Sequence, residues 1–276
     1  MNRFIAYFDY LGFKKFIENN TLDYQKRIVV NNFRDIENAL GKGKTKPAKY
    51  GVIADLSESK INCINFSDTV VFWTNDDSID SLIEILEVAH KFNWQAIDFF
   101  FPVRGAIVYG EIVYIDFKQK NSAGGVYNIN SVFGKGLVKA HEKAEMQHWA
   151  GTVFDESFIN ELVSRGYNPA DFLEPFAKKY KVPYKNKENN KKEYVMNIIQ
   201  GTLNSVALKN YGDGIKSNFS SYNKSIDNKD VQEKLSNTLK FLESYYNGEE
   251  WKAAANIVYE TFGSQWLIER FSPYQK

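Results

Sequence analysis

The chain has 276 residues, and its 43% hydrophobic and 16% aromatic content is enough for a sizeable core. Its formal net charge of +1 predicts no broad electrostatic attraction to nucleic acid or to a membrane surface, and leaves room for local basic patches. A single cysteine, Cys63, excludes an internal disulfide and fits a reducing compartment.

The start of the chain lacks the charged and apolar regions of a signal peptide. No apolar run approaches the roughly 18 residues that a membrane-spanning helix needs. We therefore expect a soluble, cytoplasmic protein that binds neither nucleic acid nor membrane. Cys63 lies in an apolar strand pattern, so we expect it in the core and not as a nucleophile.

Hydrophobic periodicity divides the first part of the chain into strands and helices. In chain order it predicts a strand (residues 3–10), a helix (13–40), a basic loop (41–51), two strands joined by a turn (57–65 and 69–74), a helix (79–98) and a fourth strand (104–115). Acidic residues and a serine at 75–78 suit the N-terminus of a helix, which places the start of the second helix there.

The later part of the chain contains more lysine and asparagine. In chain order it predicts a polar loop (117–130), a helix (136–148), a short strand (152–154), a helix (156–165), a lysine- and asparagine-rich stretch (185–192), a strand (195–199), a loop (210–228) and two helices (231–246 and 251–262). We expect one domain over residues 1–200 and a helical extension packed on it over residues 201–276.

The order strand, helix, strand, strand, helix, strand is the split βαβ or ferredoxin-like arrangement of an α+β fold. Right-handed crossovers place the first strand between the third and the fourth, antiparallel to both. The end of the first strand then lies beside the starts of its two neighbours. Asp9, Asp68 and Arg104 occupy these positions, so three charged residues far apart in the sequence converge on one edge of the sheet.

These charged residues suggest a metal site. Burying a carboxylate costs several kcal/mol unless it is paired, hydrogen-bonded or bound to a metal. Asp9 and Asp68 could hold a pair of Mg²⁺ or Mn²⁺ ions, which prefer oxygen ligands. Arg104 would then offset the charge that develops on a transferred phosphoryl group. The simpler alternatives are that Asp9 caps a turn and that Arg104 pairs with Asp98 or Glu111.

Other candidates carry less information. Backbone N–H groups of residues 10–13 could cradle phosphates. Three tyrosines could stack on a base, and the sequence does not choose among them: Tyr7, Tyr10 and Tyr50. The histidines, which we expect in the core or on the surface and not as metal ligands, are His90, His141 and His148. The lysines of residues 178–192 are most simply a solvated loop.

Four segments resemble the motifs of class III nucleotidyl cyclases. Residues 8–13 (FDYLGF) are similar to the first metal motif, and residues 66–68 (FSD) to the second, with serine where the purine cyclases usually have glycine. Residues 104–110 (RGAIVYG) look like the fourth-strand signature, and residues 134–142 (GKGLVKAHE) like the glycine-to-helix segment that follows it. The resemblance covers about residues 3–155 and implies a cyclase-like catalytic domain.

Three positions depart from the purine-selective members of that family. Val138 and Glu142 stand where those enzymes place an asparagine and an arginine that contact substrate, and Ile64 stands where adenine-selective members often have a lysine. These departures resemble the bacterial antiphage pyrimidine cyclases of the Pycsar type. The resemblance implies conversion of CTP or UTP to a 3′,5′-cyclic monophosphate and pyrophosphate, and a separate effector that senses the product.

The resemblance also implies roles for individual residues. Asp9, Asp68 and the backbone of Tyr10 would bind two Mg²⁺ or Mn²⁺ ions. Asp9, Asp68 and Arg104 would be the catalytic residues. The implied contacts to phosphate and nucleotide come from Leu11, Gly12, Phe13 and Ser67. The base-binding residues stay unassigned.

In this family the partner subunit closes the base pocket, which implies a homodimer with two sites at one interface. Residues 131–142 would reach the opposite subunit's nucleotide, and aromatic residues that could furnish the interface are Phe99, Phe100, Phe101 and Phe133. Two rival interpretations stay open. A degenerate cyclase fold would bind a nucleotide without turnover. A palm-type polymerase or diguanylate cyclase is weaker, because the sequence has no Gly-Gly-Asp-Glu-Phe turn.

Overall fold

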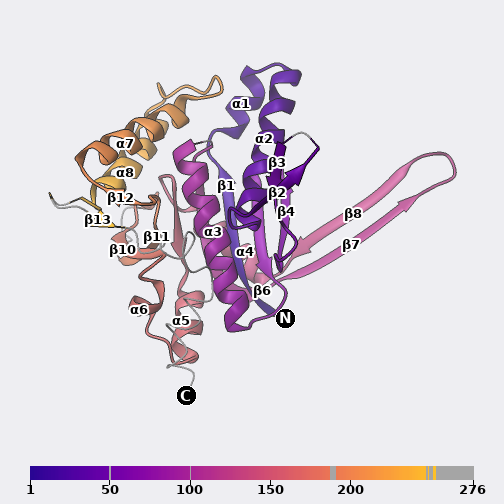
Figure 1. The fold of residues 1–276 in the computed structure, drawn as a ribbon, viewed down its shortest axis with the longest axis horizontal. Coiled ribbons are helices and arrows are strands. Elements are labelled where there is room, and N and C mark those ends of the chain that lie inside the picture. The colour runs from indigo at the N-terminus through magenta and orange to yellow at the C-terminus, as the bar shows by residue number, and fades with distance from the viewer. Residues whose placement is uncertain (50, 100, 187–190, 247, 249–250, 253–276) are drawn as a thin grey trace.

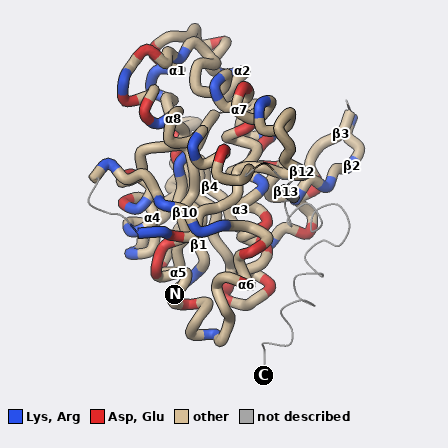
Figure 2. Tube along the Cα trace, turned by 90° about the vertical axis from the view of Figure 1, so that its left-hand side faces the viewer, with Lys and Arg blue, Asp and Glu red and all other residues tan. Residues whose placement is uncertain are grey.

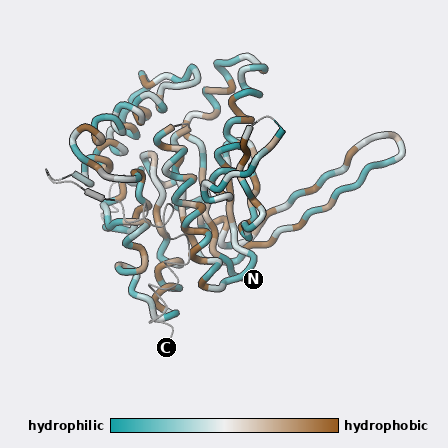
Figure 3. Tube along the Cα trace, in the orientation of Figure 1, coloured by the Kyte–Doolittle hydropathy of each residue, from teal (hydrophilic) through white to brown (hydrophobic). Residues whose placement is uncertain are grey.

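The computed structural model describes residues 1–49, 51–99, 101–186, 191–246, 248 and 251–252. This part of the chain is a mixed α+β fold, in which helices pack on both faces of a seven-stranded sheet and a long two-stranded hairpin projects from the body (Figure 1). Hydrophobic residues concentrate in the body, and both the projecting hairpin and the outer helices carry many hydrophilic ones (Figure 3). Within the described ranges, no helix is both long and apolar enough to cross a membrane.

Thirteen strands and eight helices follow one another along the described part of the chain. The strands are β1 (Asn2–Tyr10), β2 (Thr45–Ala48), β3 (Gly51–Ala54), β4 (Ile61–Phe66), β5 (Thr69–Thr74), β6 (Val103–Glu111), β7 (Val113–Lys120), β8 (Val126–Phe133), β9 (Gly151–Phe154), β10 (Ala177–Lys181), β11 (Lys192–Met196), β12 (Thr202–Leu203) and β13 (Trp251–Lys252). The helices are α1 (Phe13–Asn19), α2 (Leu22–Leu40), α3 (Ile79–Phe99), α4 (Lys135–Glu145), α5 (Glu156–Ser164), α6 (Pro169–Leu173), α7 (Ser205–Ser220) and α8 (Lys229–Glu243).

The first strand lies inside the main sheet, whose order is β10-β11-β9-β6-β1-β5-β4. β1 pairs with β5 and β6 and runs antiparallel to both, which confirms the predicted split βαβ order. Asp9 stands opposite Thr69 of β5 on one side and Arg104 of β6 on the other. β9 pairs parallel with β6, so the sheet is largely but not wholly antiparallel.

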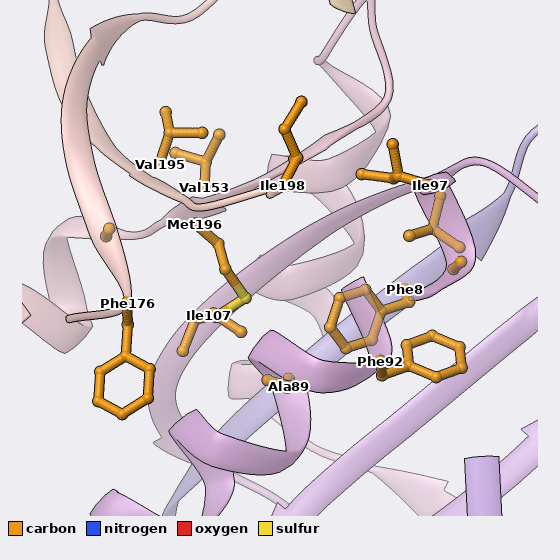
Figure 4. Packing of buried hydrophobic residues seen from close by; sticks show 14 of the residues in the cluster. Phe8, Ala89, Phe92, Ile97, Ile107, Val153, Phe176, Val195, Met196 and Ile198 are labelled. Carbon is orange, nitrogen blue, oxygen red and sulfur yellow. The ribbon is translucent and has the colours of Figure 1, made fainter. Parts of the chain in front are cut away.

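Alternate residues of β1 face opposite sides of the sheet, because side chains alternate along a strand. Phe8 and Tyr10 belong to the larger core, shared with α2 and α3, whereas Ile5 and Tyr7 belong to a smaller core shared with α4. Figure 4 shows Phe8 among the buried side chains of the larger core. Asp9 shares the parity of Ile5 and Tyr7, so its carboxylate lies on the α4 face.

The start of α3 is confirmed where the sequence predicted it. The Asp76 carboxylate accepts hydrogen bonds from the Ser78 N–H at 3.0 Å and from the Ser78 and Ser81 hydroxyls at 2.6 Å. These hydrogen bonds lower the pKa of Asp76 to about 2. A carboxylate that stays ionised therefore stabilises the beginning of this buried helix.

Three expectations for the first half of the chain are wrong. Residues 13–40 form two helices, α1 and α2, because the Asn20 side-chain amide donates to the Phe16 carbonyl oxygen at 2.7 Å and ends the first. The predicted loop at 41–51 contains β2 and the beginning of β3. The predicted loop at 117–130 is mostly paired strand, in β7 and β8. These two strands have exposed side chains on both faces, so they lack the alternation that burial produces.

Two expectations for the C-terminal region also differ from the structure. The predicted loop at 210–228 is helical as far as Ser220, because α7 begins at Ser205. The Asn204 side-chain oxygen caps this helix by accepting hydrogen bonds from the N–H groups of the second and third helical residues, at 3.1 and 2.9 Å. The helix predicted at 251–262 begins instead with the two strand residues of β13, and residues 253–262 lie outside the described residues.

α4 approaches β6 so closely that only glycine fits at two facing positions. A Cβ atom on Gly136 would lie 2.8 Å from the carbonyl carbon of Gly110, and one on Gly110 would lie 2.8 Å from the Cα of Gly136. Backbone atoms cannot swing aside as a flexible side chain can. This contact therefore fixes the position of α4 over the sheet, and with it the side chains that α4 carries.

We predict that Gly136→Ala lowers the free energy of unfolding by about 1–3 kcal/mol, the usual cost of overpacking. Gly212→Ala, within α7, is the matched control, because its Cβ would meet the side chains of Leu242 and Leu239 at ordinary distances of 3.8 and 3.9 Å. Alanine is favoured over glycine inside a helix by about 0.5–1 kcal/mol. In chemical denaturation, the midpoint denaturant concentration should be lower than that of the wild type for Gly136→Ala and higher for Gly212→Ala. A Gly136→Ala protein as stable as the wild type would contradict the close packing of α4 on β6.

Candidate functional site

The edge of the sheet where β1 ends gathers charged side chains. The Arg104 Nε donates to Asp9 Oδ2 at 2.8 Å, and the guanidinium also pairs with Glu145 of α4. The side chains of Asp9 and Arg104 are only 14% and 11% exposed. Asp98 and Glu111, which the simpler interpretation named, are not among the ion pairs of Arg104 in the described ranges. The predicted convergence therefore takes the form of a largely buried ion pair.

Asp68 reaches the same edge through a two-residue turn between β4 and β5. Ser67, the first residue of that turn, has a φ of 55°, the left-handed region in which glycine is favoured. The Tyr10 N–H donates to the Asp68 carbonyl oxygen at 2.8 Å, which ties the turn to the end of β1. The N–H and C=O of a strand residue face the same neighbour, so the Tyr10 carbonyl also faces this turn.

The electrostatics of Asp9 disfavour its charged form. Burial is the largest cause that raises the pKa of the Asp9 carboxyl, the Arg104 guanidinium lowers it, and the charge of Asp68 raises it again. The pKa of Asp9 is higher in the folded protein than in the unfolded chain. The free energy of unfolding therefore falls as the pH rises from the ordinary aspartate pKa through the raised one, because Asp9 then ionises while it is buried. A cation that binds the carboxylate would recover that stability.

The residues present fit a divalent cation in their donor chemistry. Two carboxylates and a backbone carbonyl are oxygen donors, which Mg²⁺ and Mn²⁺ prefer. In the part of the chain that the structure describes, no group of three or more His, Cys, Asp or Glu side chains is arranged to hold a metal. The Tyr10 carbonyl, phosphate oxygens and water would therefore complete the coordination of ions held by Asp9 and Asp68.

The loop after β1 has fewer free N–H groups than expected. The Leu11 N–H donates to the Pro102 carbonyl oxygen at 2.8 Å, and the Tyr10 N–H is already engaged by the turn, so neither is free to hold a phosphate. Gly12 has a φ of 81° and directly precedes α1. Of the phosphate-binding amides that the sequence suggested in this loop, those of Gly12 and Phe13 stay candidates.

A pocket of about 610 Å³ opens beside this edge, on the α4 face. Its walls come from β1, β4, β5, α4 and the end of β8. Three of its lining residues are the positions at which the sequence departs from the purine cyclases: Ile64, Val138 and Glu142. His141 lines it too, with its Nδ1 3.0 Å from the Tyr7 hydroxyl. The departures thus gather in one cavity, which the sequence alone could not show.

The other candidates are placed as follows. Tyr7 is held by the His141 contact, Tyr10 is buried on the opposite face, and Tyr50 lies outside the described residues. His90 is fully buried, and the His148 Nε2 lies 2.8 Å from an Asp230 carboxylate oxygen. Burial raises the pKa of the half-buried Cys63 to about 12, which makes a nucleophilic role unfavourable.

The aromatic residues suggested for an interface differ in exposure. Phe101 is fully buried, in the larger core, which corrects the expectation that it could furnish an interface. Phe99 and Phe133 are 53% and 49% exposed, and Phe100 lies outside the described residues. Phe66, beside the Asp68 turn, is 78% exposed, although the sequence did not suggest it as an interface residue.

Two charged residues of the site were missed. Glu145 pairs with Arg104, and its other oxygen lies 3.3 Å from the Lys185 Nζ. Burial lowers the pKa of Lys185, and the nearby Arg104 charge lowers it further. Glu145 lies four residues after His141, one helical turn along the same face, which is a signal the sequence offered. No sequence pattern indicated Lys185, because only the fold brings the lysine-rich stretch that begins at this residue close to Glu145.

Comparisons with known proteins add a likeness of fold. No family model and no curated protein sequence matches the chain. Among solved structures, it is similar to the guanylate cyclase domain of RhGC from Catenaria anguillulae in complex with GTP, at 9% identity and a TM-score of 0.47, over 71% of this chain and 96% of that one. The adenylyl cyclase CyaB from P. aeruginosa has 9% identity and a TM-score of 0.40, over 71% and 95% of the two chains. A class III adenylyl cyclase-like ATP-binding protein from Pseudomonas aeruginosa has 9% identity and a TM-score of 0.38, over 88% and 43%.

We predict that Asp68→Asn lowers the pKa of the Asp9 carboxyl in the metal-free protein, because it removes a neighbouring like charge. An NMR titration of the Asp9 carboxyl carbon measures this. Asp116→Asn, an exposed position on the projecting hairpin, is the control and should leave the Asp9 pKa as in the wild type. If Asp68→Asn also leaves it unchanged, the two carboxylates are too far apart to share an ion.

Proposed function

We propose that this chain is a divalent-cation-dependent nucleotidyl cyclase, which converts a nucleoside triphosphate to a 3′,5′-cyclic monophosphate and pyrophosphate. The observation that carries the proposal is the convergence of Asp9, Asp68 and Arg104 on one edge of the sheet, where Asp9 and Arg104 are largely buried. Two bound Mg²⁺ or Mn²⁺ ions would lower the pKa of a ribose 3′ hydroxyl and neutralise the leaving pyrophosphate.

In this reaction the ribose 3′ oxygen forms a bond to the α-phosphorus, and the bond from that phosphorus to the oxygen bridging the β-phosphate breaks. The hydroxyl proton passes to solvent and pyrophosphate leaves. Asp9 and Asp68 would hold the two ions in register with these atoms. Arg104, fixed on its other side by Glu145, would turn from Asp9 to the oxygens of the α-phosphoryl group.

For the base we propose a pyrimidine, so that the substrate is CTP or UTP. The support is the pocket lined by Ile64, Val138 and Glu142, because Val138 and Glu142 stand where the purine cyclases that the sequence resembles carry an asparagine and an arginine. The Glu142 carboxylate could accept a hydrogen bond from the exocyclic amino group of cytosine or from the N3–H of uracil, and His141 offers a ring nitrogen beside it. Following the resemblance in sequence, we further propose that the product acts as an antiviral second messenger on a separate effector.

One observation favours a second candidate, a nucleotide-binding module without turnover. Arg104 is engaged by both Asp9 and Glu145, and a guanidinium held by two carboxylates resists being drawn to a substrate. Retention of both aspartates at the sheet edge argues for the enzyme, since binding alone does not need two ions. Turnover decides between the two.

The test incubates the full chain with each of the four nucleoside triphosphates and Mn²⁺ and identifies the products by mass. We predict a cyclic monophosphate and equimolar pyrophosphate from CTP or UTP. Asp9→Ala and Asp68→Ala should each lower kcat by about a hundredfold or more, because one carboxylate cannot position both ions. Asp171→Asn, at an exposed position of α6 outside the proposed site, should keep full activity. Absence of product from every triphosphate, or near-normal activity of either alanine variant, would contradict the cyclase.

We also propose a homodimer in which each site draws on both chains. The α4 face around the pocket leaves apolar side chains uncovered, with Phe66 78% and Val138 56% exposed. The hairpin of β7 and β8 projects from the body, and its exposed large apolar residues include Ile115, Val126 and Tyr127. A lone two-stranded hairpin is marginally stable in water, so a surface that covers it is expected. A second copy related by a two-fold axis would cover both features at once.

Mixing inactive variants tests the shared site. Asp68→Ala disables the metal half, and Val138→Arg, which fills the pocket, disables the half contributed by residues 131–142. After subunit exchange, the mixture should recover about a quarter of wild-type activity, because half the dimers are mixed and each carries one intact site. Asp68→Ala mixed with Asp9→Ala is the control and should recover none, since both changes fall in the same half. No recovery in the first mixture despite proven exchange would rule out the shared site.

A further inference from the structure

Lys224 is a buried cation outside the site described so far. It lies in the connection between α7 and α8 and is 8% exposed. In the described part of the chain its Nζ has neither a hydrogen bond nor an ion pair. Its contacts are with two rings, since the Nζ lies 4.4 Å from the ring centroid of Phe101 and 5.9 Å from that of Tyr222.

The connection that carries Lys224 is fastened to α1. The Asn20 side-chain amide donates to the Tyr222 carbonyl oxygen at 2.8 Å, and the Asn19 amide donates to the Asn223 carbonyl oxygen at 2.7 Å. The Asn223 amide returns a hydrogen bond to the Asn20 side chain at 2.7 Å. Tyr222 and Asn223 both have positive φ, 61° and 59°, a conformation that non-glycine residues adopt at a cost. α1 and α8 lie at the same end of the molecule (Figure 2).

The side chain of Lys224 covers Gly12. A Cβ atom on Gly12 would lie 2.9 Å from the Lys224 Cδ, so the lysine stem rests on the glycine backbone. Gly12 follows Asp9 by three residues, at most about 11 Å of extended chain. Phe101, under the Nζ, precedes the Pro102 carbonyl that holds the Leu11 N–H. The ammonium group therefore sits beside the loop that leaves the carboxylate pair.

A largely buried lysine without a neighbouring anion is unfavourable, and the rings repay only part of the hydration that its ammonium group has lost. Burial lowers the pKa of Lys224 to about 7. Three hydrogen bonds and two left-handed residues nevertheless hold the connection in place. Such an arrangement is suited to a ligand that brings its own negative charge.

We propose that Lys224 binds the terminal phosphate of an oligophosphate whose first phosphate lies at Asp9 and Asp68. The region after residue 200 would thereby complete the nucleotide site of its own chain. This inference rests on the proposed function for the placement of the first phosphate. The competing view is that Lys224 only packs on Phe101 and Tyr222 and binds no anion.

The test is calorimetric titration of the full chain with inorganic tripolyphosphate and Mn²⁺. Lys224→Met removes the charge and keeps most of the stem over Gly12 and Phe101. Lys178→Met is the matched control, because the Lys178 Nζ likewise lies over a ring, 4.3 Å from the Tyr245 centroid, away from the site. We predict that Lys224→Met weakens tripolyphosphate binding about tenfold or more, the effect of a lost charge-assisted hydrogen bond. Lys178→Met should bind as the wild type does.

Equal affinity of wild type and a folded Lys224→Met protein would overturn the proposal, as would a wild type that does not bind tripolyphosphate. A measurement on the wild type guards against a variant that fails to fold: tripolyphosphate should slow acetylation of Lys224 severalfold, by peptide mass, and an unchanged rate would overturn the proposal. If the chain forms a cyclic product and Lys224→Met leaves the KM for the triphosphate unchanged, this inference is wrong and the proposed cyclase stands. If tripolyphosphate binding depends on Lys224 but no triphosphate is turned over, the proposed cyclase is wrong and this inference stands.

Discussion

The pairing of β1 with both β5 and β6 is the constraint on which the site depends. It sets Asp9 opposite Arg104 and next to the Asp68 turn, in a place that leaves Asp9 and Arg104 little contact with water. Removing one partner of a buried pair costs about 3–5 kcal/mol, because the remaining charge is stranded. α4 adds Glu145 to this edge only because Gly110 and Gly136 let the helix come close.

The sequence predicts this central part of the fold well, for a physical reason. β1 and β5 are buried on both faces and α3 along most of its length, so burial makes each of them an apolar run between polar flanking residues. Right-handed crossovers then fix the strand order, and the order alone brings Asp9, Asp68 and Arg104 together. Where burial imposes no period, as in β7 and β8, the same reasoning predicts a loop. It also misses α7, whose beginning depends on a capping asparagine at position 204.

The parts of the site that escaped prediction come from long-range contacts. Lys185 meets Glu145 because the segment after β10 pairs with the residues that follow α4, where the Lys185 N–H donates to the Met146 carbonyl oxygen at 2.8 Å. Lys224 meets Gly12 through a connection more than 200 residues away in sequence. No local pattern marks a lysine that a distant loop will bury. Ile64, Val138 and Glu142 were each noticed in the sequence, but only the fold shows that they line one pocket.

The central claim is that Asp9 and Asp68 hold divalent cations together, with Arg104 released from Asp9 to the substrate. In the metal-free protein the positive charge of the Arg104 guanidinium balances the negative charge of the Asp9 carboxylate. A divalent cation would therefore compete with this guanidinium for the same carboxylate. Counting bound Mn²⁺ by electron paramagnetic resonance, with a non-hydrolysable CTP or UTP analogue present, tests this most directly. The account predicts two ions per chain in the wild type and fewer in Asp9→Asn and Asp68→Asn. A wild type that binds no Mn²⁺, or a count that neither substitution changes, would contradict it.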